Sequence, residues 1–137
     1  MTRVLIDTNI VIDLLSQRSP FYEEAAKLFS LADKGKVDLI ISSLTFANTN
    51  SILSKLKSVK KAREILRKFK VLVEIADLDH KIIELALSDD RFFDFEDGLQ
   101  YYKAIENEAE VIITRNKKDF KYSQIPVLSA REYMAKE

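Results

Sequence analysis

The chain has 137 residues and a mass of 15.8 kDa, a length typical of one domain. Its 22 basic and 22 acidic residues cancel and 47% of its residues are hydrophobic, which excludes a strongly basic nucleic-acid binder and a disordered chain. The chain has no cysteine and one histidine, and this composition excludes disulfides, cysteine-based zinc sites and histidine-rich metal sites. No apolar run approaches the ~18 residues of a membrane span, so we expect a soluble, cytoplasmic protein with no membrane partner.

Short apolar runs alternate with longer amphipathic segments along the chain. The predicted strands are residues 3–6, 37–41, 71–75, 111–113 and 127–128, and the predicted helices are 10–15, 21–34, 42–56, 62–69, 80–86 and 94–108. The strands are uniformly apolar rather than alternating, which is typical of a parallel sheet buried on both faces. The sequence therefore predicts a single α/β domain over residues 1–137, with three α/β/α layers and a parallel central sheet of four or five strands.

Polar oxygen-bearing residues follow the apolar runs at the points where ligands bind in open α/β sheets. Asp7 ends the first run, Asn116 and Asp119 follow the run at 111–113, and Asp94 and Asp97 begin the helix before it. Oxygen ligands without histidine or cysteine suit Mg²⁺ or Mn²⁺. The sequence therefore predicts a metal site at one edge of the sheet, able to activate water against a phosphate.

Each of these residues also has a local interpretation. Asp7 can simply cap a helix, and Asp94 and Asp97 are favoured in a first helical turn. The segment from Thr114 to Asn116 can turn the chain after a strand, and the same holds for Asp119. For Asp7, the later acids in matching positions favour the site interpretation.

Four segments in order resemble a PIN domain: Leu5–Asn9, Ser43–Thr45, Asp94–Gln100 and Ile113–Phe120. The resemblance covers nearly the whole chain. It implies a Rossmann-like sheet, a cluster of acids that binds Mg²⁺ or Mn²⁺, and ribonuclease activity on single-stranded RNA. Small members of this kind resemble VapC-type toxins, so the resemblance also implies a small antitoxin partner and a homodimer.

The resemblance assigns roles residue by residue. It implies that the main catalytic acids are Asp7, Asp97 and Asp94. It implies a metal-binding set of Asp7, Asp97, Asp94, Asn116 and Asp119. It implies a supporting set of Thr8, Asn9, Thr45, Asn48 and Thr114.

Asn48 departs from the family pattern, which usually has Glu three residues after Thr45. Asparagine offers one neutral carbonyl oxygen in place of a carboxylate. The site then holds one weakly bound metal, or gains a carboxylate from another acid such as Asp13 or Asp119, or has lost catalysis and only binds. We favour reduced but real metal-dependent activity.

Charge is sorted along the chain although its sum is zero. Residues 55–70 contain eight basic residues and a single acidic one, Glu64. Residues 89–97 contain five acidic residues and a single basic one, Arg91. The basic stretch could guide an RNA backbone towards the acids, chiefly through Lys60, Lys61 and Arg63. It is equally well interpreted as a solvated helix face.

Other functions compete with a nuclease. A PIN-like fold that lost catalysis at Asn48 would be an RNA- or protein-binding module. A phosphatase with Asp7 as nucleophile would need a second acid two residues later, where the chain has Asn9. A dinucleotide-binding protein would need a glycine-rich turn after the first strand, and the chain has two glycines in all.

Overall fold

The computed structural model describes residues 2–136 and contains one sheet of five parallel strands in the order β3-β2-β1-β4-β5. The strands are β1 (Thr2–Ile6), β2 (Val37–Ser42), β3 (Glu74–Ala76), β4 (Val111–Ile113) and β5 (Val127–Leu128). The helices are α1 (Thr8–Leu15), α2 (Tyr22–Asp33), α3 (Ser43–Leu56), α4 (Val59–Phe69), α5 (His80–Leu87), α6 (Phe95–Glu106) and α7 (Ala130–Ala135). The predicted α/β class and parallel sheet are confirmed, with five strands.

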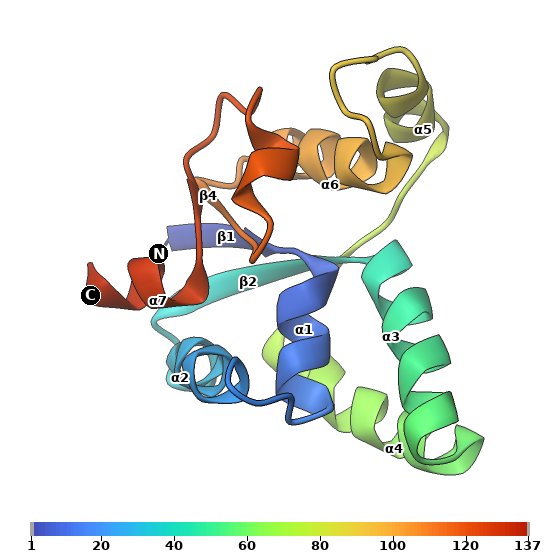
Figure 1. The fold of residues 1–137 in the computed structure, drawn as a ribbon, viewed down its shortest axis with the longest axis vertical. Helices are drawn as coiled ribbons and strands as arrows, with labels where there is room; N and C mark the ends of the chain where they lie inside the picture. Colours follow the sequence, from blue (N-terminus) through green and yellow to red (C-terminus); the bar gives the residue numbers. More distant parts are fainter. Residues whose placement is uncertain (1, 137) are drawn as a thin grey trace.

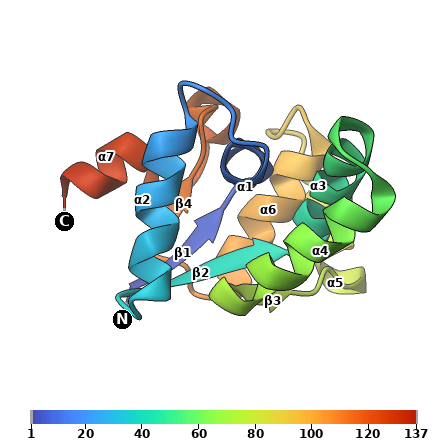
Figure 2. The same cartoon turned by 90° about the horizontal axis from the view of Figure 1, so that it is seen from below.

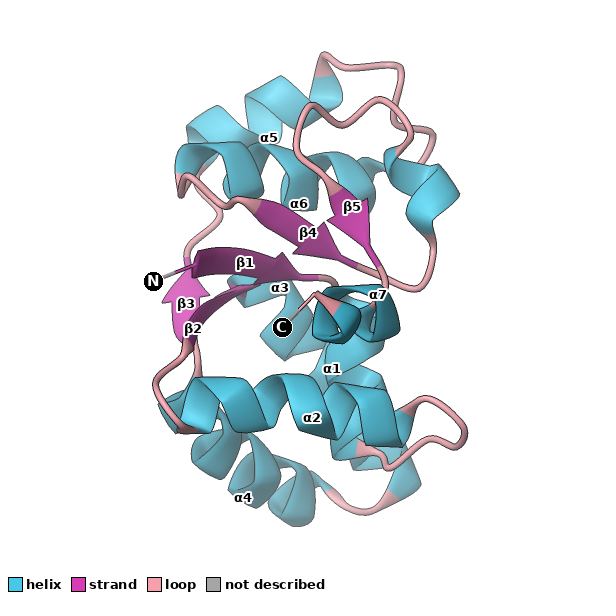
Figure 3. Cartoon of the chain, turned by 90° about the vertical axis from the view of Figure 1, so that its left-hand side faces the viewer, coloured by secondary structure: helices cyan, strands magenta, loops and turns pink. Residues whose placement is uncertain are grey.

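Helices cover both faces of the sheet, which gives the three layers predicted from the apolar strands (Figure 1). Figure 3 shows α5 and α6 on one side of the sheet and α1, α2, α4 and α7 on the other. Consecutive residues of β1 point to opposite faces: Val4 packs into the cluster around Leu28 of α2, whereas Leu5 packs into the cluster around Tyr101 of α6. Burial on both faces therefore explains why the strands have no polar residues in alternation.

Because all the strands of the sheet are parallel, their carboxyl ends lie at one edge of it. β1 pairs with both β2 and β4, so it is the central strand (Figure 2 shows β1 beside β2 beneath the helices). Asp7 leaves β1 with its amide N–H on the carbonyl of Ile113 at 2.9 Å, and Ser42 ends β2 as the N-cap of α3. The residues after β1, β2 and β4 are thus held side by side.

One predicted strand is misplaced, and one helix lies outside the predicted elements. Residues 71–75 do not form one strand, because a 3₁₀ turn at Lys70–Leu72 leaves Val71 81% exposed and only Glu74–Ala76 pair with β2. Helix α7 was not predicted, although Ser129 and Glu132 form a capping box, a spacing visible in the sequence.

No helix within residues 2–136 combines the length and the apolar character that crossing a membrane requires.

Candidate functional site

A cleft of about 300 Å³ opens at the carboxyl ends of the strands. It gathers side chains from five separate parts of the chain, namely the end of β1 with α1, the α1–α2 connection, α3, the start of α6 and the segment after β4. Its lining residues are Asp7, Thr8, Asn9, Ile12, Arg18, Asn48, Ile52, Asp94, Glu96, Asp97, Gln100, Asn116 and Asp119. The five residues predicted to bind metal therefore all face one space.

Asp7 is buried in this cleft, 7% exposed, and uncharged groups contact both of its oxygens. Thr114 donates its hydroxyl to Oδ2 at 2.8 Å, and the Asn9 amide reaches the same oxygen at 3.3 Å. The backbone N–H of Thr8 donates to Oδ1 at 2.9 Å, so Asp7 is also the N-cap of α1. The cap and site interpretations of Asp7 are thus compatible, because the same carboxylate caps the helix and faces the cleft.

A layer of buried hydroxyls lies behind Asp7. Thr45 is fully buried, and its hydroxyl is 2.8 Å from that of Thr8 and 3.0 Å from Nε2 of Gln100. Gln100 Nε2 also reaches Oδ1 of Asp7 at 3.4 Å. Thr114, likewise fully buried, accepts the N–H of Asn116 at 3.0 Å. Thr8, Asn9 and Thr114 thus contact Asp7 directly, and Thr45 contacts Thr8 and Gln100, while the supporting role of these four residues stays a prediction.

The start of α6 places its acids at the cleft in two different ways. Asp94 is the N-cap, and its Oδ1 accepts the N–H of Glu96 at 2.8 Å, which matches the local interpretation of this residue. Asp97 lies in the first turn, and burial raises its pKa to about 7, assisted by the negative charges of Asp7, Asp94, Asp119 and Glu96. Burial also raises the pKa of Asp7 above its ordinary value. The cleft thus concentrates negative charge.

Asn48, the residue that departs from the family pattern, faces Glu96 across the cleft. Its Nδ2 donates to Oε1 of Glu96 at 3.0 Å. Sequence reasoning missed both Glu96 and Gln100 as cleft residues. The spacing from Asp97 to Gln100 could have revealed the second, since residues three apart share a helix face.

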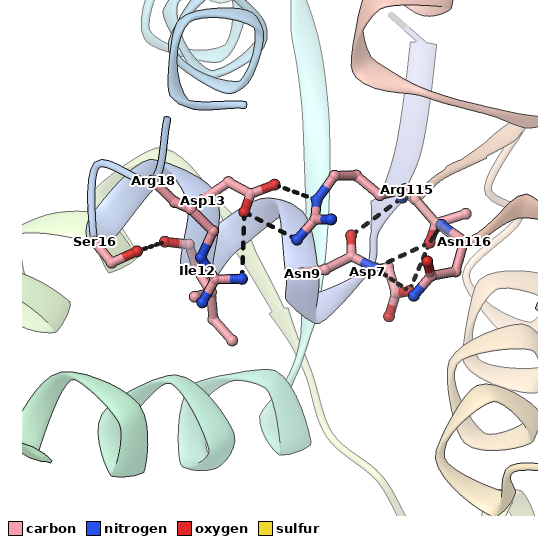
Figure 4. Close-up of polar contacts among 9 residues, drawn as sticks. Asp7, Asn9, Ile12, Asp13, Ser16, Arg18, Arg115 and Asn116 are labelled. Carbon is pink, nitrogen blue, oxygen red and sulfur yellow. Dashed lines mark hydrogen bonds and ion pairs between the residues drawn. The ribbon is translucent and has the colours of Figure 1, made fainter. Parts of the chain in front are cut away.

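Asp13 does not supply the missing carboxylate of the cleft. It is fully buried, and Arg115 binds both of its oxygens, at 2.7 Å from Nε and 3.2 Å from Nη2 (Figure 4). Arg18 approaches Asp13 at 3.8 Å. Asp13 and Arg115 line a second, larger and more apolar hollow of about 490 Å³, beside α2 and α7. The structure therefore gives Asp13 a role in an ion pair outside the cleft.

The predicted RNA-guiding residues Lys60, Lys61 and Arg63 lie exposed on α4. None of the residues that line the cleft belongs to this helix. Their proposed role stays a prediction.

The sequence matches the PIN domain model over residues 3–118. The chain belongs to the PIN domain family. It is 29% identical over 135 residues to "Ribonuclease VapC1" of Aquifex aeolicus (strain VF5), an alignment that covers 96% of this chain and 92% of the relative. The expected family is thus confirmed, and with it the resemblance to VapC-like toxins.

Solved structures share the fold. A "Toxin-antitoxin complex from Klebsiella pneumoniae" is 26% identical with a TM-score of 0.69, covering 93% of this chain and 97% of that one. "VapBC2 from Rickettsia felis bound to a DNA fragment from their promoter" is 23% identical with a TM-score of 0.68, covering 93% and 98%. This second likeness supports the PIN fold alone.

The chemistry of the cleft fits a hard divalent cation. Its donors are carboxylate and amide oxygens, the ligands that Mg²⁺ and Mn²⁺ prefer. Gln100 is 2% exposed, and its Oε1 atom has no hydrogen-bond partner. Among residues 2–136, no three acidic or histidine side chains already stand close enough to hold an ion together. The donors would therefore have to converge when an ion binds.

Proposed function

We propose that this PIN domain is a metal-dependent endoribonuclease that hydrolyses phosphodiester bonds of single-stranded RNA. The observation that carries the proposal is that Asp7, Asp97 and Asp119, from three distant segments, line one cleft. Burial raises the pKa of Asp7 and, with neighbouring carboxylates, that of Asp97, and a bound cation would favour the charged form of both. Residues 1–137 act in this proposal as one domain.

The residues of the cleft divide the work between binding and positioning. Asp7 and Asp97 are the main metal ligands, with Asp94, Asn116 and Asp119 as further ligands, directly or through water. When bound, Mg²⁺ or Mn²⁺ supplies Lewis-acid activation of water and stabilises charge on the phosphate. Thr114 and the N–H of Thr8 fix the two Asp7 oxygens in place, so the carboxylate needs little reorganisation to act as a ligand.

We further propose that the chain is the toxin of a toxin–antitoxin pair, acting in the cytoplasm as a homodimer with a small antitoxin protein. Support comes from its likeness to a relative named as a VapC ribonuclease and to a solved toxin–antitoxin complex. If a short reading frame lies beside the gene, co-expression with its product, followed by purification and light scattering, tests both partners. A monomeric chain that does not bind this product would contradict this part of the proposal.

A cleavage assay separates the nuclease from a pure binding module. The wild-type protein should cut single-stranded RNA in Mn²⁺ or Mg²⁺ and stop in EDTA, and Asp7→Asn should lower the rate about 100-fold or more. RNA binding without cleavage in saturating Mn²⁺ would instead support the binding module. Activity that arises only in Asn48→Glu would identify an impaired nuclease.

RNA guidance by the basic helix is tested separately. Changing Lys60 and Lys61 to Glu should weaken RNA binding at low salt and flatten its salt dependence, because fewer phosphates release counterions. Unchanged affinity at low salt would remove the guiding role and leave a solvated helix face.

A further inference from the structure

Asn48 of α3 and Glu96 of α6 form a polar pair across the mouth of the cleft. The Asn48 amide donates to the Glu96 carboxylate at 3.0 Å, and both side chains line the same space as Asp7 and Asp97. Glu96 is exposed and Asn48 half-buried. A carboxylate is therefore held at this wall of the cleft, but it comes from α6 rather than from position 48.

Gln100 provides an independent sign that this wall contacts a ligand. It lies one helical turn after Glu96, so the two side chains share a face of α6 and both line the cleft. Its amide nitrogen donates to Thr45 at 3.0 Å, whereas its carbonyl oxygen is buried without a partner. A buried acceptor left unpaired costs about 1–3 kcal/mol, so native proteins pair nearly all of them. A water in the shell of a bound ion would supply the missing donor.

Because Asn48 is neutral, its side chain can lie next to the carboxylate of Glu96 without repulsion. A glutamate at position 48 would place a second carboxylate within hydrogen-bonding range of Glu96, and the two would repel. The neutral amide instead donates a hydrogen bond that fixes the direction of the Glu96 side chain. Asp13 offers no alternative at this wall, because Arg115 occupies both of its oxygens.

We propose that Glu96 is a ligand of the divalent cation and that Asn48 positions it, so that the carboxylate missing at position 48 is supplied from the opposite wall of the cleft. The inference rests on the proposed function, since it concerns the same ion. In this proposal Asn48 contributes to metal binding and is not a loss of function in the site.

Titration of the metal-free protein with Mn²⁺, monitored by calorimetry in the absence of RNA, tests whether Glu96 replaces a carboxylate at position 48 as a ligand. Glu96→Gln should weaken Mn²⁺ binding about tenfold. The double variant Glu96→Gln with Asn48→Glu should recover affinity to within about threefold of wild type, because it returns one carboxylate and one amide to the pair. Glu84→Gln, an equal charge change at an exposed position of α5, should leave binding unchanged. Circular dichroism checks that each variant remains folded.

Asp7→Asn distinguishes this inference from the proposed function. If Asp7→Asn loses Mn²⁺ binding while Glu96→Gln binds like wild type, Glu96 is no ligand and only this inference fails. If Glu96→Gln loses affinity and the double variant does not regain it, the exchange with position 48 is refuted. If the wild-type protein binds no Mn²⁺ at millimolar concentration, the metal-dependent function fails together with the inference.

Discussion

Asp7 and Asp13 lie at opposite ends of helix α1, both withdrawn from solvent, and their surroundings contrast sharply (Figure 4). Asp13 pairs with Arg115 through two hydrogen bonds and has Arg18 nearby. The groups that hydrogen-bond Asp7, within the part of the chain that the structure describes, are all uncharged. An arginine neutralises a buried carboxylate, whereas hydroxyls and amides orient it and leave its charge for a cation from outside.

The contrast predicts unequal effects of two equivalent substitutions, and the loss at Asp13 is the largest effect on stability that we expect. Asp13→Asn removes the charge that balances Arg115 and should lower the free energy of unfolding by about 3 kcal/mol. Asp7→Asn should lower it by less, because burial disfavours the charged form of Asp7 and the hydrogen bonds lost there come from uncharged donors. Both changes nearly conserve volume, so packing does not confuse the comparison.

Urea unfolding at pH 7.5 without divalent cations measures both variants. Equal losses of stability would show that the uncharged donors hold Asp7 as firmly as the arginine holds Asp13. Such a result would remove the distinction between an acid committed to structure and an acid kept for a ligand.

Asp97 extends the comparison to pH, with a smaller effect. Its folded pKa of about 7 lies above the ordinary value of an aspartate, so between pH ~4 and 7 the folded state binds more protons than the unfolded one. The contribution of Asp97 to the free energy of unfolding therefore falls as the pH rises through that window, and the full loss is reached above pH 7. Because Asp97 is half-buried and solvent screens it, we expect Asp97→Asn to stabilise the protein by about 1–2 kcal/mol at pH 8.

Thermal unfolding of wild type and Asp97→Asn from pH 4 to 8 gives the measurement. The difference between the two proteins should shrink towards pH 4 and be largest above pH 7. Asp33→Asn, a charge change on the exposed end of α2, serves as the control. A gap that stays constant with pH would contradict the elevated pKa of Asp97.

The sequence predicts most of the sheet because its strands are buried on both faces and their apolar runs are therefore unbroken. Edge strand β3 is an exception, because it pairs only with β2 and two of its three residues are exposed. The prediction from the apolar run at 71–75 therefore placed this strand too early in the chain. Helix α7 shows the reverse, a real capping signal at Ser129 that hydrophobic periodicity overlooks.

The candidate site divides in the same way. Motifs locate Asp7 and Asp119, because residues after parallel strands meet at one edge, and they locate Asp97 in the first turn of α6. They do not reveal which distant side chains pair there. The bond between Asn48 and Glu96, and the ion pair that engages Asp13, depend on how α3, α6 and β4 approach one another. No local pattern in the sequence encodes those approaches.

Arg115 offers the finest test of the contrast, with the smallest expected effect. Its guanidinium binds Asp13 through two nitrogens and lies 4.0 Å from the ring centre of Phe21. Lysine keeps the charge but loses the planar fork and the stacking, so Arg115→Lys should cost about 1 kcal/mol of stability. The Asn9 contact to residue 115 uses the backbone N–H and survives the change, so RNA cleavage should stay within about threefold of wild type.

Urea unfolding compared with Arg63→Lys, at an exposed position of α4, isolates that loss. If Arg115→Lys is as stable as wild type, a point charge suffices for Asp13, and the geometry of the arginine contributes nothing. If it instead abolishes cleavage while stability falls by only about 1 kcal/mol, the two ends of α1 are coupled, and the ion pair that holds Asp13 also sets the position of Asp7.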